Sequence, residues 1–257
     1  MSYIGTENFY LEVAKGNIPG HSLVHKFGRN PIVPNGSWTF INLLGQTAFP
    51  LTAATTVIVK AGGNAADDKD AGAGAREVTV QGIVATTFLE ETDTLLPDGA
   101  TASAASSKSF WRVHRAWVSA VGTYEAANTG DIVIENSGGG TDITKIAAGE
   151  GQTQDAAYTI PAGKTGYLAS VHTTVSAGTS KTVNIRCFVR EDMDDTTAPM
   201  PAKRVKLFWD GLDRPFIYRP YSPELSIPEK ADIWFEGYGD GGTSEVTIDF
   251  EILLVDN

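Results

Sequence analysis

Two clusters of acidic residues are the part of this sequence best suited to metal-ion chemistry. Asp67-Asp68-Lys69-Asp70 lies in a stretch rich in Gly and Ala, and Glu191-Asp192-Met193-Asp194-Asp195 follows a strand-like run. Crowded carboxylates repel one another, and a hard cation relieves that repulsion. Neither cluster has the central Gly and terminal Glu of a twelve-residue calcium loop. We therefore expect solvated acidic loops and no resident metal, with Asp192, Asp194 and Asp195 as the weak candidates for ligands.

The four histidines do not form a recognisable catalytic or metal-binding group. His21 and His25 have the i, i+4 spacing that suits a metal on a helix, but a Pro-Gly pair precedes them and argues against a helix. Gly163-Lys164-Thr165 matches the end of a phosphate-binding loop, but Tyr158 stands where that loop requires Gly. A Gly-x-Ser-x-Gly hydrolase motif is absent. We expect a protein that is not an enzyme. A single sequence does not exclude a glycosidase whose two catalytic carboxylates lie far apart along the chain.

The elements that must position these residues are β-strands. Apolar and polar residues alternate in the runs Thr55–Val59, Glu77–Gln81, Asp131–Glu135, Lys181–Ile185 and Glu245–Phe250. A period of two puts one face of each run in a core and the other face in water. Clusters of Gly, Pro, Asn, Asp and Ser separate the runs, and no convincing amphipathic helix interrupts them. The sequence therefore predicts an all-β, jelly-roll-like antiparallel β-sandwich.

The run from Phe110 to Val121 is predicted to be a central strand. Trp111, Val113, Arg115 and Trp117 share the face that resembles a core, with the arginine as its anomaly. Two stretches rich in Gly, Ala, Ser and Asp, at 61–74 and 96–109, have poor means of packing a core and are predicted to be long surface loops.

Residues 1–50 differ from the rest of the chain, which we expect to form the sandwich body over residues 51–257. Pro and Gly interrupt the N-terminal segment repeatedly, which disfavours long regular elements. The segment is close to neutral, because Lys15, Lys26 and Arg29 stand against two glutamates. We predict an extended N-terminal arm with short strands that packs on its own sandwich or on a neighbouring subunit.

Composition restricts the partners and the compartment. The formal net charge of −11 should repel phosphates, so no nucleic acid partner is expected. Cys187 is the sole cysteine, which excludes an intrachain disulfide, and its place in an alternating run indicates a small buried hydrophobe. No signal peptide is visible, and no apolar run approaches the ~18 residues that span a membrane. We expect no membrane partner and no cofactor.

Short segments occurring in one order along most of the chain carry a resemblance to a known family. They are Leu23–Pro31, Gly72–Gly82, Phe110–Ala116, Asn128–Ile132, Gly149–Gln152, Tyr158–Thr165 and Pro228–Ile233. In this order they resemble structural proteins encoded in the head and tail gene blocks of marine tailed phages, mostly podovirus-like. The stretch Leu95–Thr101 departs from the family's more usual Leu-Asn-Gly-Thr turn. The resemblance implies a virion component and carries over no binding residues.

The leading hypothesis is a bacteriophage virion protein that decorates or cements the capsid by binding across capsomer junctions. It implies the major capsid protein as partner, self-association as a homotrimer, and a place in the virion after assembly in the bacterial host cytoplasm. Docking is assigned to the arm, at Lys15, His25, Lys26, Phe27, Arg29 and Trp38. The alternatives are a tail or adaptor/fibre component, and a carbohydrate-binding β-sandwich or glycosidase that uses exposed aromatic residues. Among the tryptophans, Trp38 and Trp209 are the two that the alternation does not place on a core-like strand face.

Overall fold

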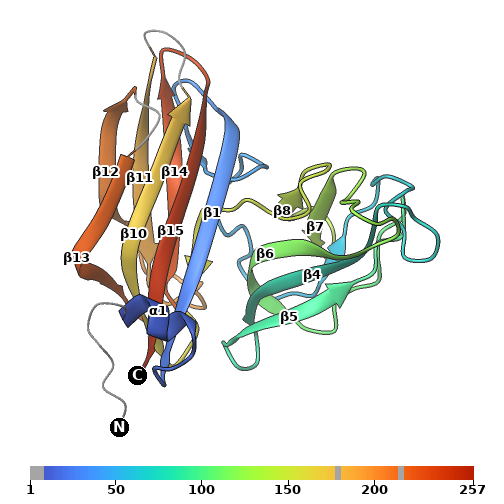
Figure 1. Ribbon diagram of the computed structural model, residues 1–257, viewed down its shortest axis with the longest axis horizontal. Coiled ribbons are helices and arrows are strands. Elements are labelled where there is room, and N and C mark those ends of the chain that lie inside the picture. Colours follow the sequence, from blue (N-terminus) through green and yellow to red (C-terminus); the bar gives the residue numbers. More distant parts are fainter. Residues whose placement is uncertain (1–8, 177–180, 214–216) are drawn as a thin grey trace.

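The computed structural model describes residues 9–176, 181–213 and 217–257, which form two lobes built almost entirely of β-strands (Figure 1). The described residues include a single short helix, α1 (Phe9–Ala14). The predicted all-β class is confirmed. Within the described ranges, no helix is long and apolar enough to cross a membrane.

The larger lobe is a sandwich of two antiparallel sheets. The first sheet has the order β1 (His21–Val33), β15 (Ser244–Asp256), β10 (Lys164–Ser176) and β13 (Ile217–Ile227). The second sheet has the order β12 (Arg204–Leu212), β11 (Thr182–Arg190), β14 (Asp232–Asp240) and β2 (Trp38–Phe40), and β9 (Ala157–Thr159) pairs with another part of β14. These two strand orders are those of a jelly roll, so the predicted sandwich is confirmed.

The sandwich core follows from the period-two alternation in the sequence. Val246, Ile248 and Phe250 of β15 are all fully buried on the face turned toward the second sheet. Phe250 meets Phe235 of β14 across the core, with ring centroids 5.2 Å apart. Cys187 of β11 is also fully buried, and burial raises the pKa of its thiol. The expected role of this cysteine as a small core hydrophobe is confirmed.

The smaller lobe, called the inserted lobe (residues 51–150), interrupts the jelly roll between β2 and β9. It contains two three-stranded antiparallel sheets. One has the strand order β3 (Val57–Val59), β7 (Ile132–Asn136) and β8 (Asp142–Ile146), and the other has the order β5 (Glu90–Leu95), β4 (Ala75–Val84) and β6 (Phe110–Val121). A second hydrophobic core, separate from that of the sandwich, lies between these sheets. The expected single body over residues 51–257 is therefore divided into two lobes with two cores.

The segment predicted as an extended arm contributes a long strand to the sandwich instead. β1 pairs with β15 from His21 opposite Val255 to Val33 opposite Ser244, and it forms the edge of the first sheet. The register shifts after Asn30, beside Pro31, which an edge strand tolerates because its outer N–H groups need no ladder partner. Residues 1–8 of the predicted arm lie outside the described residues.

The two stretches predicted as long surface loops are held in place by hydrogen bonds to the backbone. Ser103 and Ser106 accept hydrogen bonds from the N–H groups of Val59 and Val57 of β3, each at 2.9 Å. In the other stretch, the Asp67 carboxylate is buried and accepts three backbone N–H bonds of 2.7–2.8 Å. These stretches contain few large apolar side chains, but side-chain-to-backbone bonding orders them without a core of their own.

Candidate functional site

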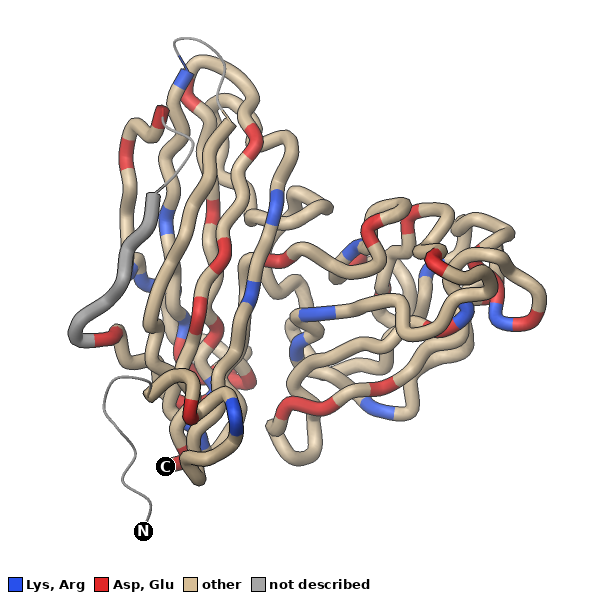
Figure 2. Tube along the Cα trace, viewed as in Figure 1, with Lys and Arg blue, Asp and Glu red and all other residues tan. Residues whose placement is uncertain are grey.

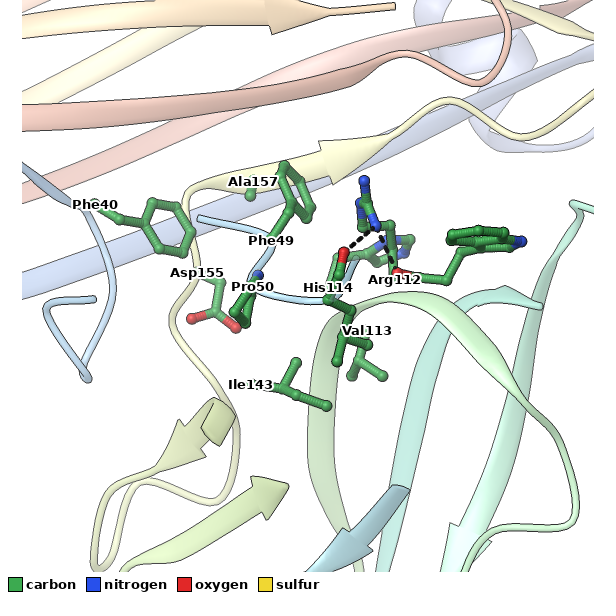
Figure 3. Close-up of a pocket in the computed structure, with 11 residues that line it drawn as sticks. Phe40, Phe49, Pro50, Arg112, Val113, His114, Ile143, Asp155 and Ala157 are labelled. Atoms are coloured by element: carbon green, nitrogen blue, oxygen red, sulfur yellow. Dashed lines mark hydrogen bonds between the residues drawn. The ribbon is translucent and has the colours of Figure 1, made fainter. Parts of the chain in front are cut away.

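The lobes meet at a junction that is packed with buried polar and aromatic side chains (Figure 3). The connecting segment after β2 brings Phe49 and Pro50 against β6 of the inserted lobe. Phe49 lies edge-on to Trp234 of β14, with ring centroids 5.9 Å apart. The remaining cavity is only about 20 Å³, which is room for about one water molecule. This part of the junction is therefore a structural contact between the lobes.

A buried ion pair forms the centre of the lobe junction. Arg112 of β6 and Asp232 of β14 each have side chains that are 1% exposed, and they bond through Nε to Oδ1 at 3.0 Å and Nη2 to Oδ2 at 2.9 Å. Thr159 donates to the same carboxylate at 2.7 Å, and Arg190 donates to it at 3.1 Å. The Arg112 guanidinium also donates to the carbonyl oxygens of Leu51, Trp111 and Met193. This bonding satisfies both buried charges and fixes the inserted lobe on the sandwich.

A second polar group joins β1 to the inserted lobe beside this ion pair. Lys26 of β1 is 2% exposed, and its ammonium group donates to the backbone carbonyl of His114. The His114 ring is bonded through Nε2 to Glu90 Oε1 at 2.6 Å, and Tyr158 donates to Glu90 Oε2 at 3.2 Å. The buried Nδ1 of His114 has no hydrogen-bond partner among the described residues. A hollow of about 180 Å³, partly lined by Arg115, opens beside these groups.

Burial dominates the protonation behaviour of this second group. It lowers the pKa of Lys26 to about 7, with Arg115 adding to the effect. It also raises the pKa of Asp155, a buried carboxyl group that interacts electrostatically with Lys26, to about 6. Burial also lowers the pKa of His114, although Glu90 opposes that shift. For Glu90 itself, burial acts to raise the pKa, but the bonds from His114 and Tyr158 outweigh it and the pKa is lowered. Buried charge at the lobe junction therefore changes near neutral pH.

The residues predicted to dock on a capsid do not lie on one surface. Lys26 is enclosed in the lobe junction, so it is removed from any docking surface. His25, Phe27 and Arg29 lie on the opposite face of β1, where Arg29 pairs with Glu245 at 2.6 Å. Lys15 follows α1 and pairs with Glu12 at 2.9 Å, and Trp38 lies on the outer face of the second sheet. The period of two in β1 separates Lys26 from its neighbours in sequence.

The weak metal candidates do not converge either. The Asp194 carboxylate pairs with Lys230 at 2.8 Å, and Asp195 accepts a backbone N–H bond from Thr197 at 3.3 Å. Asp192 is exposed and occupies the left-handed backbone region with φ of 48°. Among the described residues, no group of three or more His, Cys, Asp or Glu side chains is arranged to hold a metal ion.

The face of β6 that was predicted to be the core is only partly buried, with Val113 in the core of the inserted lobe. Arg112 and His114 are both 1% exposed, whereas Trp111, Arg115 and Trp117 on the other face are half-buried. Arginine and histidine are buried here because partners on β14 and β5 satisfy them, and those partners are distant in sequence. The sequence did contain a signal for this, because the period-two alternation places Arg112 and His114 on the same face of the strand.

Comparisons with known proteins leave the chain without a family. No protein-family model and no curated protein matches it. Among solved structures, a chain from the structure of the infectious bursal disease virus Gt strain shares 11% sequence identity with this chain, with a TM-score of 0.27. The match covers 97% of this chain and 78% of that chain. The VP2 subviral particle of that virus is 11% identical with a TM-score of 0.26, covering 93% and 73%. At these values the likeness carries no argument about function.

Proposed function

We propose that the chain is a non-enzymatic structural protein of a bacteriophage virion, and that it decorates the capsid by contacting the major capsid protein. The proposal is supported by the ordered resemblance to structural proteins of marine tailed phages and by the jelly-roll topology, which capsid proteins share with lectins and other families. Fold alone does not assign function, so the proposal depends on a surface that fits such a role.

The observation that carries the proposal is the apolar surface of α1, which lies at the foot of the first sheet (Figure 1). Phe9, Tyr10 and Leu11 are consecutive and are 37%, 41% and 48% exposed. Val13 is buried beneath them, and the Tyr10 hydroxyl donates to Glu224 of β13 at 2.7 Å, so the helix is fixed to the sandwich. Large exposed apolar side chains on an anchored element are typical of a protein interface.

The copy number of the chain in purified virions is the first test, measured by quantitative mass spectrometry against the major capsid protein. We expect about one copy per capsid subunit, or one trimer per local three-fold axis. About a dozen copies would instead place the chain in a tail or adaptor, because those assemblies have low rotational symmetry. Absence from virions would refute the proposal.

The docking role of α1 is tested by variants that leave the sandwich intact. Removing residues 1–36 would delete β1 and its whole ladder with β15, so the truncation must end at residue 17, before β1 begins. We expect this truncation and Leu11→Ser to weaken binding to purified capsids by about tenfold or more. Ile32→Ser is the matched control, since Ile32 is 66% exposed but lies elsewhere. Unchanged binding by the truncated, folded protein would refute docking through α1.

Self-association as a homotrimer belongs to the same proposal, because local three-fold positions on a capsid favour a three-fold partner. Light scattering coupled to size exclusion should give three chain masses for the purified protein or for the protein released from capsids. A single chain mass in both samples would exclude the trimer and leave capsid decoration by monomers.

A further inference from the structure

The outer face of the second sheet carries an aromatic platform, defined by Trp38, Phe208, Tyr238 and Arg186. The rings of Tyr238 and Phe208 lie 5.3 and 6.2 Å from that of Trp38. The Arg186 guanidinium carbon lies 3.3 Å from the centre of the Trp38 ring and 5.8 Å from that of Phe208. Phe208 is 52% exposed, so the platform faces solvent.

Arg186 has an unusual electrostatic position within this platform. In a chain of net charge −11, acidic residues are spread over both lobes (Figure 2). Within the part of the chain that the structure describes, however, no hydrogen bond or ion pair reaches this guanidinium, and its buried Nε has no partner. The opposite residue on β14 is Glu236, which bonds instead to Lys203 at 3.1 Å and to Trp234 Nε1 at 2.9 Å. Arg186 is therefore held in place by stacking and is left free to bind an anion.

An open groove continues from the platform across the same face of the sheet. Two hollows of about 470 and 360 Å³ adjoin, because both are lined by Thr47, Lys203 and Glu236. Trp38 belongs to the platform and also lines the larger hollow, together with Gln46. The groove thus combines aromatic surface with hydroxyl, amide, ammonium and carboxylate groups, at a size typical of small-molecule sites.

This combination of groups fits one class of ligand. A pyranose ring presents an apolar C–H surface that packs on aromatic side chains, and its hydroxyls both donate and accept hydrogen bonds. Lys203 supplies donors and Glu236 supplies acceptors for such hydroxyls within the groove. A planar guanidinium binds a carboxylate with two parallel hydrogen bonds. We propose that this face binds an oligosaccharide bearing carboxylates, with sugar rings against Trp38 and a carboxylate on Arg186.

The test titrates the full-length protein with alginate hexasaccharide, a chain of uronic acid units, and follows tryptophan fluorescence and calorimetric heat. We expect saturable binding that is about tenfold or more tighter than binding of neutral cellohexaose, because a charge-assisted bidentate contact is lost with the neutral sugar. No saturable binding of alginate hexasaccharide at millimolar concentration would overturn the proposal.

Variants separate the platform from charge alone. Arg186→Gln should reduce alginate affinity to the level of cellohexaose, and Arg186→Lys should not restore it, because an ammonium lacks the planar fork. Arg204→Gln is the matched control, since Arg204 is an exposed arginine on β12 that already pairs with Glu191. Trp38→Phe should weaken both sugars while thermal unfolding stays close to wild type.

Three results would overturn the assignment. Equal loss of affinity in Arg204→Gln and Arg186→Gln, or equal binding of dextran sulfate, would mean attraction by charge alone. Loss of capsid binding in Trp38→Phe without any alginate binding would make this face a protein-docking surface. Because the capsid assay and the sugar assay are separate, failure of one proposal leaves the other to be judged on its own data.

Discussion

Removing the carboxylate of Asp232 should be among the most damaging single changes to this protein. Asp232→Asn deletes the charge that Arg112 and Arg190 share and that Thr159 also bonds, in a side chain that is 1% exposed. Arg112 would then be a buried cation with only carbonyl oxygens as partners. Breaking a buried ion pair on one side costs about 3–5 kcal/mol. At an m-value of about 3 kcal/mol/M, that cost lowers the urea midpoint by about 1–2 M.

The assay is urea unfolding followed by both tryptophan fluorescence and far-ultraviolet circular dichroism. Since each lobe has its own core, we also expect the two signals to separate in Asp232→Asn, as the lobes lose their coupling. Asp210→Asn on β12 is the control, because Asp210 is exposed and lies on the edge strand of the second sheet. A midpoint for Asp232→Asn that matches the Asp210→Asn control would refute the assignment of the ion pair as the main link between lobes.

Three other predictions test the lobe junction and the backbone packing. Lys26 has a folded pKa of about 7, below its unfolded value of 10.5, so the unfolded chain binds more protons between these values. Stability should therefore rise from pH 7 to 10 in the wild type, and Lys26→Met should flatten that rise in thermal unfolding scans. Asp67→Ala should cost about 2 kcal/mol, because the buried N–H of Ala75 and the partly buried N–H groups of Thr129 and Gly130 lose their acceptor. The exposed Asp70→Ala in the same stretch should cost little, and urea unfolding compares the two variants. Gly28→Ala should cost at least about 2 kcal/mol of stability, because the added Cβ would lie 2.1 Å from the backbone nitrogen of Ala156. Gly138→Ala is the control, since its Cβ would meet no atom closer than 3.4 Å, and thermal unfolding compares the two variants.

The sandwich was predictable because its strands follow a local rule. Val246, Ile248 and Phe250 alternate with polar residues, and the structure buries all three on one face. The Cys187 prediction succeeded for the same reason. A pattern of period two depends only on neighbours in the sequence, so it survives without knowledge of the partner strand.

The failures all concern long-range pairing. The burial of Arg112 on the other face of β6 was missed because its carboxylate partner lies 120 positions away, on β14. Likewise, Pro31 argued against a long strand, but β1 is an edge strand and its ladder shifts register at that point. The inserted lobe was not distinguished from the sandwich, because the strands of both lobes carry the same alternation. The docking residues were grouped by closeness in sequence, which alternating strand faces separate.

The two proposed surfaces lie on different sheets of the sandwich, and this makes their functions separable. α1 is attached to the first sheet, through Tyr10 to Glu224 on β13 and through the edge-on contact of Phe9 with His21 on β1. The aromatic platform is on the outer face of the second sheet, on β2, β11, β12 and β14. A capsid bound through α1 would therefore leave Trp38 open to solvent.

This separation predicts independent losses. Leu11→Ser should lower capsid binding and leave alginate affinity unchanged, and Arg186→Gln should do the reverse. Both assays use the full-length chain, and the two positions lie on elements of different sheets, so their effects should add. A variant that lost both activities while remaining folded by circular dichroism would refute this separation. One continuous surface would then have to bind both partners.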